Sequence, residues 1–206
     1  MAGQFPTSPN FRSLNFQDNR PTLLNQTLSG KKQVRQIGSQ YFSFTVAMPP
    51  LQQDKAQEVF AFLQKQKGSF EDFTIVAPLD NLGASKSETD ILVAGVHSAG
   101  DNTIAMDGFS QTTGALKAGD YIKFANHSKV YMVSEDANAS GGAVTVTISP
   151  NLVSSLADNE AVTVNKPSFT VYLENNEIMY STDASGFYSI SFCLLYTSDA
   201  ADEEDS

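Results

Sequence analysis

The feature that most constrains the fold is the texture of residues 79–165. This stretch has no helical periodicity, and short apolar segments recur about every ten residues. Between them stand pairs that favour tight turns, such as Gly100-Asp101, Gly119-Asp120 and Gly141-Gly142. The pattern predicts a small antiparallel barrel or sandwich. Its expected strands are Ile91–Val96, Thr103–Met106, Asp120–Phe124, Lys129–Ser134, Ala143–Ser149 and Ala161–Val164.

Longer strands are predicted before this stretch. Lys31–Ile37 and Gln40–Met48 read as a hairpin, with a tight turn supplied by Gly38. In the second strand the apolar residues fall on alternate positions, which predicts one buried face. Pro49-Pro50 ends the strand because proline has no amide to donate. The predicted buried face consists of Phe42, Phe44, Val46 and Met48.

One amphipathic helix is predicted over residues 54–67. Asp54 is the expected N-cap and Gly68 the C-terminal stop. Positions 56, 59, 60 and 63 are Ala, Val, Phe and Leu, a stripe that favours packing on the sheet over ligand binding. A strand carrying Phe70, Phe73, Ile75 and Val76 follows.

Strand periodicity returns after residue 166, in Phe169–Leu173 and again in Phe187–Phe192. These two strands are the expected partners of the first hairpin and helix. We therefore predict a mainly β, α+β chain with one packed helix. Its discontinuous domain comprises residues 31–78 and 167–192, and residues 79–166 form an inserted small all-β domain.

The two ends differ from the rest. Residues 1–30 lack regular periodicity and read as an extended arm that docks at intervals, with a disordered leader as the alternative. The anchors of the arm are Phe5, Phe11, Leu14, Phe16, Leu23, Leu24 and Leu28. Residues 193–206 read as a disordered acidic tail. Within it, residues 193–203 resemble the translation of a sequencing-library adapter, so no redox role is assigned to Cys193.

Charge is distributed unevenly along the chain. The formal net charge is −10, yet residues 1–50 carry five basic side chains against Asp18 alone, while the last eight residues carry five acidic ones. Acidity argues against nucleic-acid binding as the main role, because such binding depends on clustered Lys and Arg. No apolar run approaches the roughly 18 residues of a membrane span, and no secretory signal opens the chain. A soluble protein without a membrane anchor is expected.

The sequence shows no recognisable motif of a catalytic site. His97 and His127 are the only histidines, without further metal ligands at a suitable spacing. There is no Gly-x-Ser-x-Gly elbow, and no Gly-Lys-Ser/Thr of a phosphate loop. We therefore predict no enzyme, no catalytic residue, no cofactor-binding residue and no metal site. A Ser-His-Asp triad assembled from distant positions stays open by counting alone.

Two further groups of residues have competing readings. Asp101, Asp107 and Asp120 stand in or beside turns, where shaping the turn is favoured over binding a cation. Lys117, Lys123 and Lys129 alternate with apolar residues. For these lysines, strand positions facing water are favoured over a nucleic-acid groove.

Several segments together resemble tail proteins of tailed bacteriophages, of the distal-tail or tail-tip ring type. They are Asn19–Gln36, Tyr41–Pro50, Ala61–Phe70, Leu116–Phe124 and Lys129–Val133, and the likeness spans about residues 10–192. The resemblance implies a β-sandwich or split-barrel tail-type domain. It also implies a structural virion protein, made in the cytoplasm of the bacterial host.

The resemblance further implies a homo-oligomeric ring, expected to be a hexamer, that connects the tail tube to the tip or baseplate. Residues 31–48 would add to an inter-subunit barrel, and residues 1–30 would dock on a neighbour. The insertion would project outward for contacts with a fibre or with host-surface glycan. The alternatives are another virion protein, such as a tail tube or head-tail connector, and a carbohydrate-binding module or glycan-active enzyme.

Overall fold

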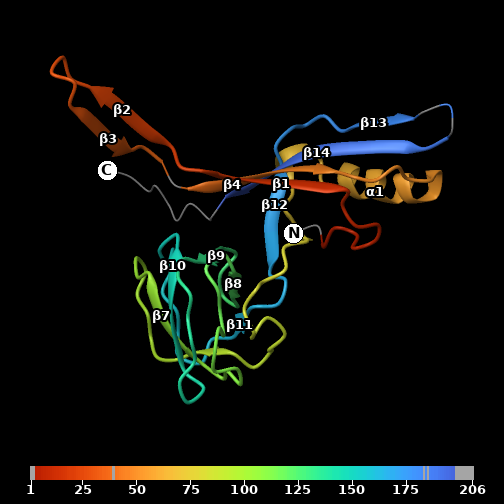
Figure 1. Ribbon diagram of the computed structural model, residues 1–206. Coiled ribbons are helices and arrows are strands. Elements are labelled where there is room, and N and C mark those ends of the chain that lie inside the picture. Colours follow the sequence, from red (N-terminus) through yellow and green to blue (C-terminus); the bar gives the residue numbers. More distant parts are fainter. Residues whose placement is uncertain (1–2, 39, 183, 185, 198–206) are drawn as a thin grey trace. The chain divides into compact units, whose positions relative to one another are not determined.

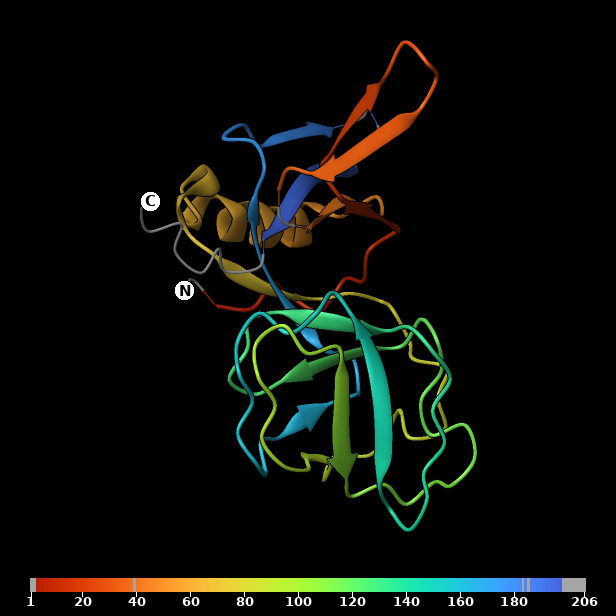
Figure 2. The same ribbon diagram turned by 90° about the vertical axis from the view of Figure 1, so that its left-hand side faces the viewer.

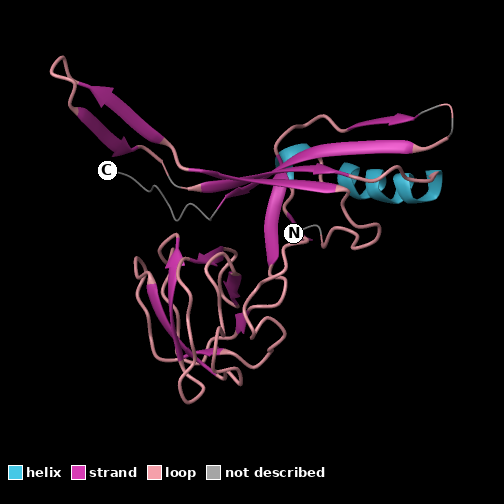
Figure 3. Cartoon of the chain, viewed as in Figure 1, coloured by secondary structure: helices cyan, strands magenta, loops and turns pink. Residues whose placement is uncertain are grey.

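The computed structural model describes residues 3–38, 40–182, 184 and 186–197. Strands dominate this described part, which contains a single α-helix, α1 (Figure 3). The mainly β class with one packed helix is thereby confirmed. The chain divides into two compact units. Unit 1 holds the described residues up to Phe73 and from Val171 onward, and unit 2 is Thr74–Thr170. No described helix has the length and apolar character needed to cross a membrane.

Unit 1 is organised around an antiparallel sheet in the order β1-β4-β14-β12-β5, with β13 paired to β14 (Figure 1). The central pair is β4 and β14, in which Ser191 lies opposite Ala47 and Thr197 opposite Tyr41. A second sheet packed face to face on this one, as in a β-sandwich, is not found among the described residues of unit 1. The strands are β1 (Ser13–Asn19), β4 (Tyr41–Ala47), β5 (Phe73–Val76), β12 (Ser168–Leu173), β13 (Met179–Thr182) and β14 (Tyr188–Thr197).

The core of unit 1 follows from alternation along these strands. All four residues of the predicted face, from Phe42 to Met48, are buried, which confirms that prediction. In β14 the buried residues also alternate, and Tyr196 stacks on Phe42 with ring centroids 5.7 Å apart. Because side chains alternate between faces, both strands direct their large residues to one side of the sheet. The buried residues of β14 are Ile190, Phe192, Leu194 and Tyr196.

Helix α1 (Gln53–Lys65) covers this apolar side, and its buried residues are Ala56, Val59 and Leu63. The predicted helix is therefore confirmed, but the predicted cap is wrong. Gln52 holds the N-cap position without a side-chain bond, and Asp54 lies in the first turn. A single 3-10 turn (Gly68–Phe70) follows in place of the predicted start of a strand, and it leaves Phe70 exposed.

The predicted hairpin of residues 31–48 is wrong in its pairing. β3 (Lys32–Gln36) pairs with β2 (Thr22–Gln26), whereas β4 pairs with β1 and β14. The turn stands at Thr27–Lys31, where Gly30 has a φ of 79° that suits glycine. Gly38 makes no reversal, because the Ile37 amide still donates to the Pro21 carbonyl at 3.1 Å. The ribbon therefore continues past the position where the turn was expected.

Both ends of the chain also depart from expectation. Phe5 is buried within unit 1, against Phe62, Phe73 and Phe192 at centroid distances of 5.5, 6.4 and 5.6 Å. Part of the predicted arm thus packs on its own subunit, and residues 13–19 and 22–26 form strands instead of an irregular arm.

The predicted disordered tail is wrong for residues 193–197, which pair with β4 as the end of β14. The reason is alternation, because Leu194 and Tyr196 continue the buried side of β14 beyond Phe192. Residues 198–206, which make up most of the predicted tail, lie outside the described residues. An adapter origin of residues 193–203 stays a prediction that the nucleotide sequence decides.

Unit 2 is a curved sheet in the order β11-β8-β9-β10-β7-β6 (Figure 2). Its first and last strands meet, because the Val93 amide donates to the Glu160 carbonyl and the Val162 amide donates to the Ile91 carbonyl, both at 2.9 Å. The sequence left open whether this region is a barrel or a sandwich, and the structure shows a nearly closed barrel. Its strands are β6 (Leu92–Val93), β7 (Thr103–Asp107), β8 (Tyr121–Phe124), β9 (Val130–Val133), β10 (Val144–Ser149) and β11 (Val162–Thr163).

The interior of the barrel is apolar and continuous. Every strand contributes at least one side chain with almost no exposure, and β10 alternates buried and outward residues along its length. This one core explains why strands of only two to six residues remain ordered. Fully buried members include Ile91, Val93, Ile104, Met106, Leu116, Ile122, Phe124, Tyr131, Val133, Val146 and Val164.

Candidate assembly surfaces

The β2–β3 ribbon is the part of unit 1 that its own chain covers least. Every side chain of β2 is exposed, and so are those of Lys32–Arg35 in β3. The turn is held locally, where the Thr27 hydroxyl accepts a bond from the Lys31 amide at 3.1 Å and the Gly30 amide donates to the Thr27 carbonyl at 2.8 Å. A ribbon of two strands is only marginally stable in water by itself. Its exposed surface is therefore a candidate for contact with a partner.

Apolar side chains stand on both faces of this ribbon. Leu24 and Val34 are cross-strand partners on one face, and Leu23 lies opposite Arg35 on the other. Of the eleven exposed large hydrophobic side chains in the described structure, five belong to the ribbon and its base. Single exposed apolar residues are common on protein surfaces, but a cluster of them is typical of an interaction site. The five are Leu23, Leu24, Leu28, Val34 and Ile37, with exposures of 48, 55, 111, 55 and 60%.

The ribbon is also basic. Residues 20–37 contain Arg20, Lys31, Lys32 and Arg35 and no acidic residue, which gives a net charge of +4. Arg20 pairs with Asp18 at 3.0 Å, whereas Lys32 and Arg35 have no ion pair with any described residue. The surface therefore combines apolar contact area with positive charge that is not neutralised locally.

Sequence reasoning identified three of the five apolar residues of this surface. Leu23, Leu24 and Leu28 were predicted as docking anchors, and all three are exposed. Val34 and Ile37 belong to residues 31–48, which were predicted to add to an inter-subunit barrel, but neither was singled out as a docking anchor. The missed signal is Gly30 between two runs of equal length, because a turn there places Val34 beside Leu24.

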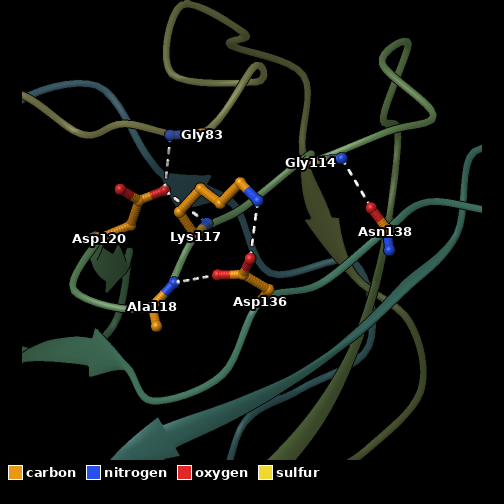
Figure 4. A network of polar contacts seen from close by, with 7 residues as sticks. All are labelled: Gly83, Gly114, Lys117, Ala118, Asp120, Asp136 and Asn138. Carbon is orange, nitrogen blue, oxygen red and sulfur yellow. Dashed lines mark hydrogen bonds and ion pairs between the residues drawn. The ribbon is translucent and has the colours of Figure 1, made fainter.

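In unit 2, side-chain carboxylates and amides hold the loops in place (Figure 4). Asp120, 1% exposed, accepts bonds from the amides of Leu82, Gly83 and Lys117 at 2.6, 3.0 and 2.9 Å. Gly83 is required there, because a Cβ at this position would lie 2.6 Å from the Asp120 carboxylate. The structure thus places Asp120 in a loop-fixing role.

A second set of polar contacts holds the neighbouring loop (Figure 4). Asp136 accepts bonds from the Ala118 amide at 3.0 Å and the Lys117 ammonium at 2.7 Å. The hydrogen bond from Lys117 is the main reason that the pKa of Asp136 lies below its ordinary value. Asn138 accepts from the Gly114 amide at 2.7 Å. These side chains act on their own backbone and are not arranged around a substrate.

The other singled-out aspartates and histidines do not converge. Asp101 accepts from the Ser98 amide at 2.9 Å within a turn, and Asp107 is exposed on β7. His97 accepts from the Ala105 amide at 3.2 Å. Across the described ranges, no three His, Cys, Asp or Glu residues lie close enough to hold a metal ion.

His127 lies in the barrel interior and not on a ligand surface. Its Nδ1 is 2.8 Å from the Tyr131 hydroxyl, which in turn accepts a bond from the Val153 amide at 3.2 Å. Burial lowers the pKa of His127 and raises the pKa of Tyr131 to about 12. Both groups are therefore uncharged at neutral pH.

The three lysines of the basic stretch were predicted to face water, and for two of them this is wrong. Lys129 is 1% exposed. Lys123 is partly buried and donates to the carbonyl and hydroxyl oxygens of Ser168 at 3.0 and 3.3 Å, and burial lowers its pKa. Lys117 pairs with Asp136. They do not form an exposed basic groove.

Two comparisons with known proteins agree with this architecture. Residues 85–169 match the family model described as "Distal tail protein pb9, B domain", a range that lies within unit 2. The chain is also 25% identical over 180 residues to "Distal tail protein pb9" of Escherichia phage T5, covering 87% of each chain.

These two matches support the assignment of the chain as a structural protein of a bacteriophage tail, and hence as a component of the virion. Within that class it is a distal tail protein. The resemblance noted in the sequence is confirmed.

Proposed function

We propose that the protein assembles into a ring, a hexamer, at the distal end of the tail and joins the tail tube to the tip or baseplate. The observation that carries this proposal is the uncovered β2–β3 ribbon, which presents apolar side chains on both faces and a net charge of +4. Apolar side chains that their own subunit leaves about half exposed can be buried further only by a partner. The matched relative, a distal tail protein by its name, supports the place in the tail.

Each part of the chain has its own role in this proposal. The ribbon and the discontinuous domain of residues 31–78 and 167–192 make the contacts between subunits. The inserted domain of residues 79–166 projects outward, where it contacts a fibre or glycan on the host surface. The protein is made in the host cytoplasm before it joins the virion. Its role is assembly, without an enzymatic step or a cofactor.

The test compares the assembly of three purified proteins by sedimentation velocity and electron microscopy. They are the unaltered chain, a ribbon variant with Leu24→Asp and Val34→Asp, and a control with Val96→Asp on unit 2, where Val96 is 75% exposed. We expect rings from the unaltered chain and the control, and monomers from the ribbon variant. If all three proteins remain monomeric at every concentration tested, the ring proposal is wrong.

A labelled antibody on intact particles tests the position in the tail. Labelling at the distal end is expected. Labelling along the whole tail would favour a tail-tube protein, and labelling at the head would favour a connector.

A further inference from the structure

A second exposed apolar surface lies at the opposite end of unit 1. At one end of β14, Thr197 pairs with Tyr41, close to where the β2–β3 ribbon joins the sheet. At the other end, Tyr188 pairs with Thr182 of β13. β14 has ten residues, so about 30 Å separates the two ends. Figure 1 shows the β2–β3 ribbon extending from one end of unit 1 and strand β13 lying at the other. The two surfaces therefore do not meet within one chain.

We define this surface as the end patch, formed by Phe60, Met179, Tyr180 and Tyr188. Tyr180 packs edge-on against Phe60 at 4.8 Å and lies 5.8 Å from Tyr188, which fixes the aromatic rings in place. Even so, Met179 remains 75% exposed and Tyr180 50%. Tyr180 is a favourable anchor for a partner, because its half-exposed ring already packs against Phe60 and Tyr188 and would lose little side-chain entropy when covered.

The end patch also presents a strand edge. β13 pairs only with β14 in the described part of the chain, and all four of its residues are exposed. Met179 lies opposite Ser191 and Tyr180 opposite Ile190, so the two apolar side chains point to opposite faces of the strand. An edge strand with apolar residues on both faces is suited to accept another strand. The ribbon has the same property, with Leu24 and Leu23 on opposite faces.

Charge distinguishes the two surfaces and makes them complementary. Residues 171–182 contain Glu174 and Glu177, both exposed, and no basic residue. The ribbon carries a net charge of +4 without an acidic residue. Two copies joined ribbon to ribbon would bring like charges together, whereas ribbon to end patch brings opposite charges together.

We propose that the β2–β3 ribbon of one subunit docks on the end patch of a second copy of this chain, along the free edge of β13. A contact between two different surfaces at opposite ends of a subunit is heterologous, and such a contact generates a ring when its rotation closes. This inference rests on the proposed function and names the surface that accepts the ribbon. Lys32 and Arg35 face Glu174 and Glu177 in this contact.

Charge reversal tests the contact. Lys32→Glu with Arg35→Glu, and separately Glu174→Lys with Glu177→Lys, are each expected to weaken self-association at least ten-fold in sedimentation velocity at low salt. The two pairs combined in one chain are expected to restore it. The matched control is Asp107→Lys with Glu135→Lys, two exposed acidic residues of unit 2, and it should assemble as the unaltered chain does.

The outcomes separate this inference from the proposed function. If reversal at the ribbon prevents assembly while reversal at the end patch leaves it intact, the ribbon docks elsewhere. In that case the end patch is rejected, but a ring remains. If neither reversal has an effect, both the end patch and the role of the ribbon in the ring are wrong. A chain that is monomeric alone and binds only another tail protein overturns the second copy as the occupant.

Disulfide trapping gives a readout independent of charge. In a Cys193→Ser background, Leu24→Cys protein is mixed with Met179→Cys protein under mild oxidation. A crosslink between the two proteins is expected, because the docked ribbon would bring position 24 of one copy beside position 179 of the other. Leu24→Cys mixed with Val96→Cys is the control, and equal crosslinking in both mixtures would reject the contact.

Discussion

The β2–β3 ribbon and the barrel of unit 2 are both built from short antiparallel strands with tight turns, yet they treat their apolar residues in opposite ways. In the barrel, Ile104, Phe124 and Val146 are completely buried, whereas Leu24 and Val34 in the ribbon are 55% exposed. The barrel closes on itself and the ribbon has two free edges. Strand chemistry alone therefore does not decide whether the apolar side chains are buried. Closure does, because it lets one set of strands cover another.

The largest expected effect comes from emptying the barrel core. Phe124→Ala removes a fully buried ring, and it should lower the free energy of unfolding by about 3–5 kcal/mol. The matched change in the ribbon, Leu24→Ala, should stay within about 0.5 kcal/mol, because its side chain is half exposed. Urea denaturation of the two variants measures both values. Similar losses at the two positions would show that the ribbon is part of a core.

A smaller effect is expected at the turns. Asp120→Asn removes the carboxylate oxygen that accepts from at least one of three backbone amides, and it should cost about 2 kcal/mol because Asp120 itself is buried. Thr27→Ala removes the side-chain acceptor in the ribbon turn, where water replaces it, and should cost about 0.5 kcal/mol or less. Urea midpoints compared at constant slope provide the test. A larger loss for Thr27→Ala would reverse the contrast between buried and exposed turns.

The smallest effect is a dependence on pH that belongs to the barrel. Because burial lowers the pKa of His127, the unfolded chain takes up a proton first as the pH falls through about 6.5. Stability of unit 2 should then decrease between pH 7 and 5, by on the order of 1 kcal/mol.

His127→Gln should flatten this slope, whereas His97→Gln should leave it unchanged. Both histidines lie outside residues 20–37, so the assembly of the ribbon should not follow the same titration. Denaturation at a series of pH values checks the slope. An unchanged slope in His127→Gln would assign the effect to other groups.

Local patterns predicted the strands of unit 2 to within a few residues. Val144–Ser149 stands where Ala143–Ser149 was expected, and Val130–Val133 lies within the predicted Lys129–Ser134. Turn residues precede both runs, Gly141-Gly142 before the first and Asn126-His127 before the second, and each run directs apolar residues inward. Where turn residues and alternating apolar residues agree, the sequence is sufficient to predict a strand and its approximate limits.

Pairing partners were harder to predict, because they depend on contacts distant in sequence. Val34 alternates with its neighbours in the same way whether β3 pairs with β4 or with β2. Gly30 and Gly38 both offered a turn, and only the backbone conformation selects Gly30. For the same reason Met179 and Tyr180 went unnoticed, since their exposure is set by the strand order and not by their local pattern.

The route of the chain between the units has a further consequence. The chain leaves unit 1 within β5 and returns within β12, and these two strands are neighbours in the sheet. Entry and exit of the inserted unit therefore lie side by side, as in domains that tolerate insertion or exchange. We therefore expect that unit 2 can be removed or exchanged for another domain without altering the register of β4 and β14.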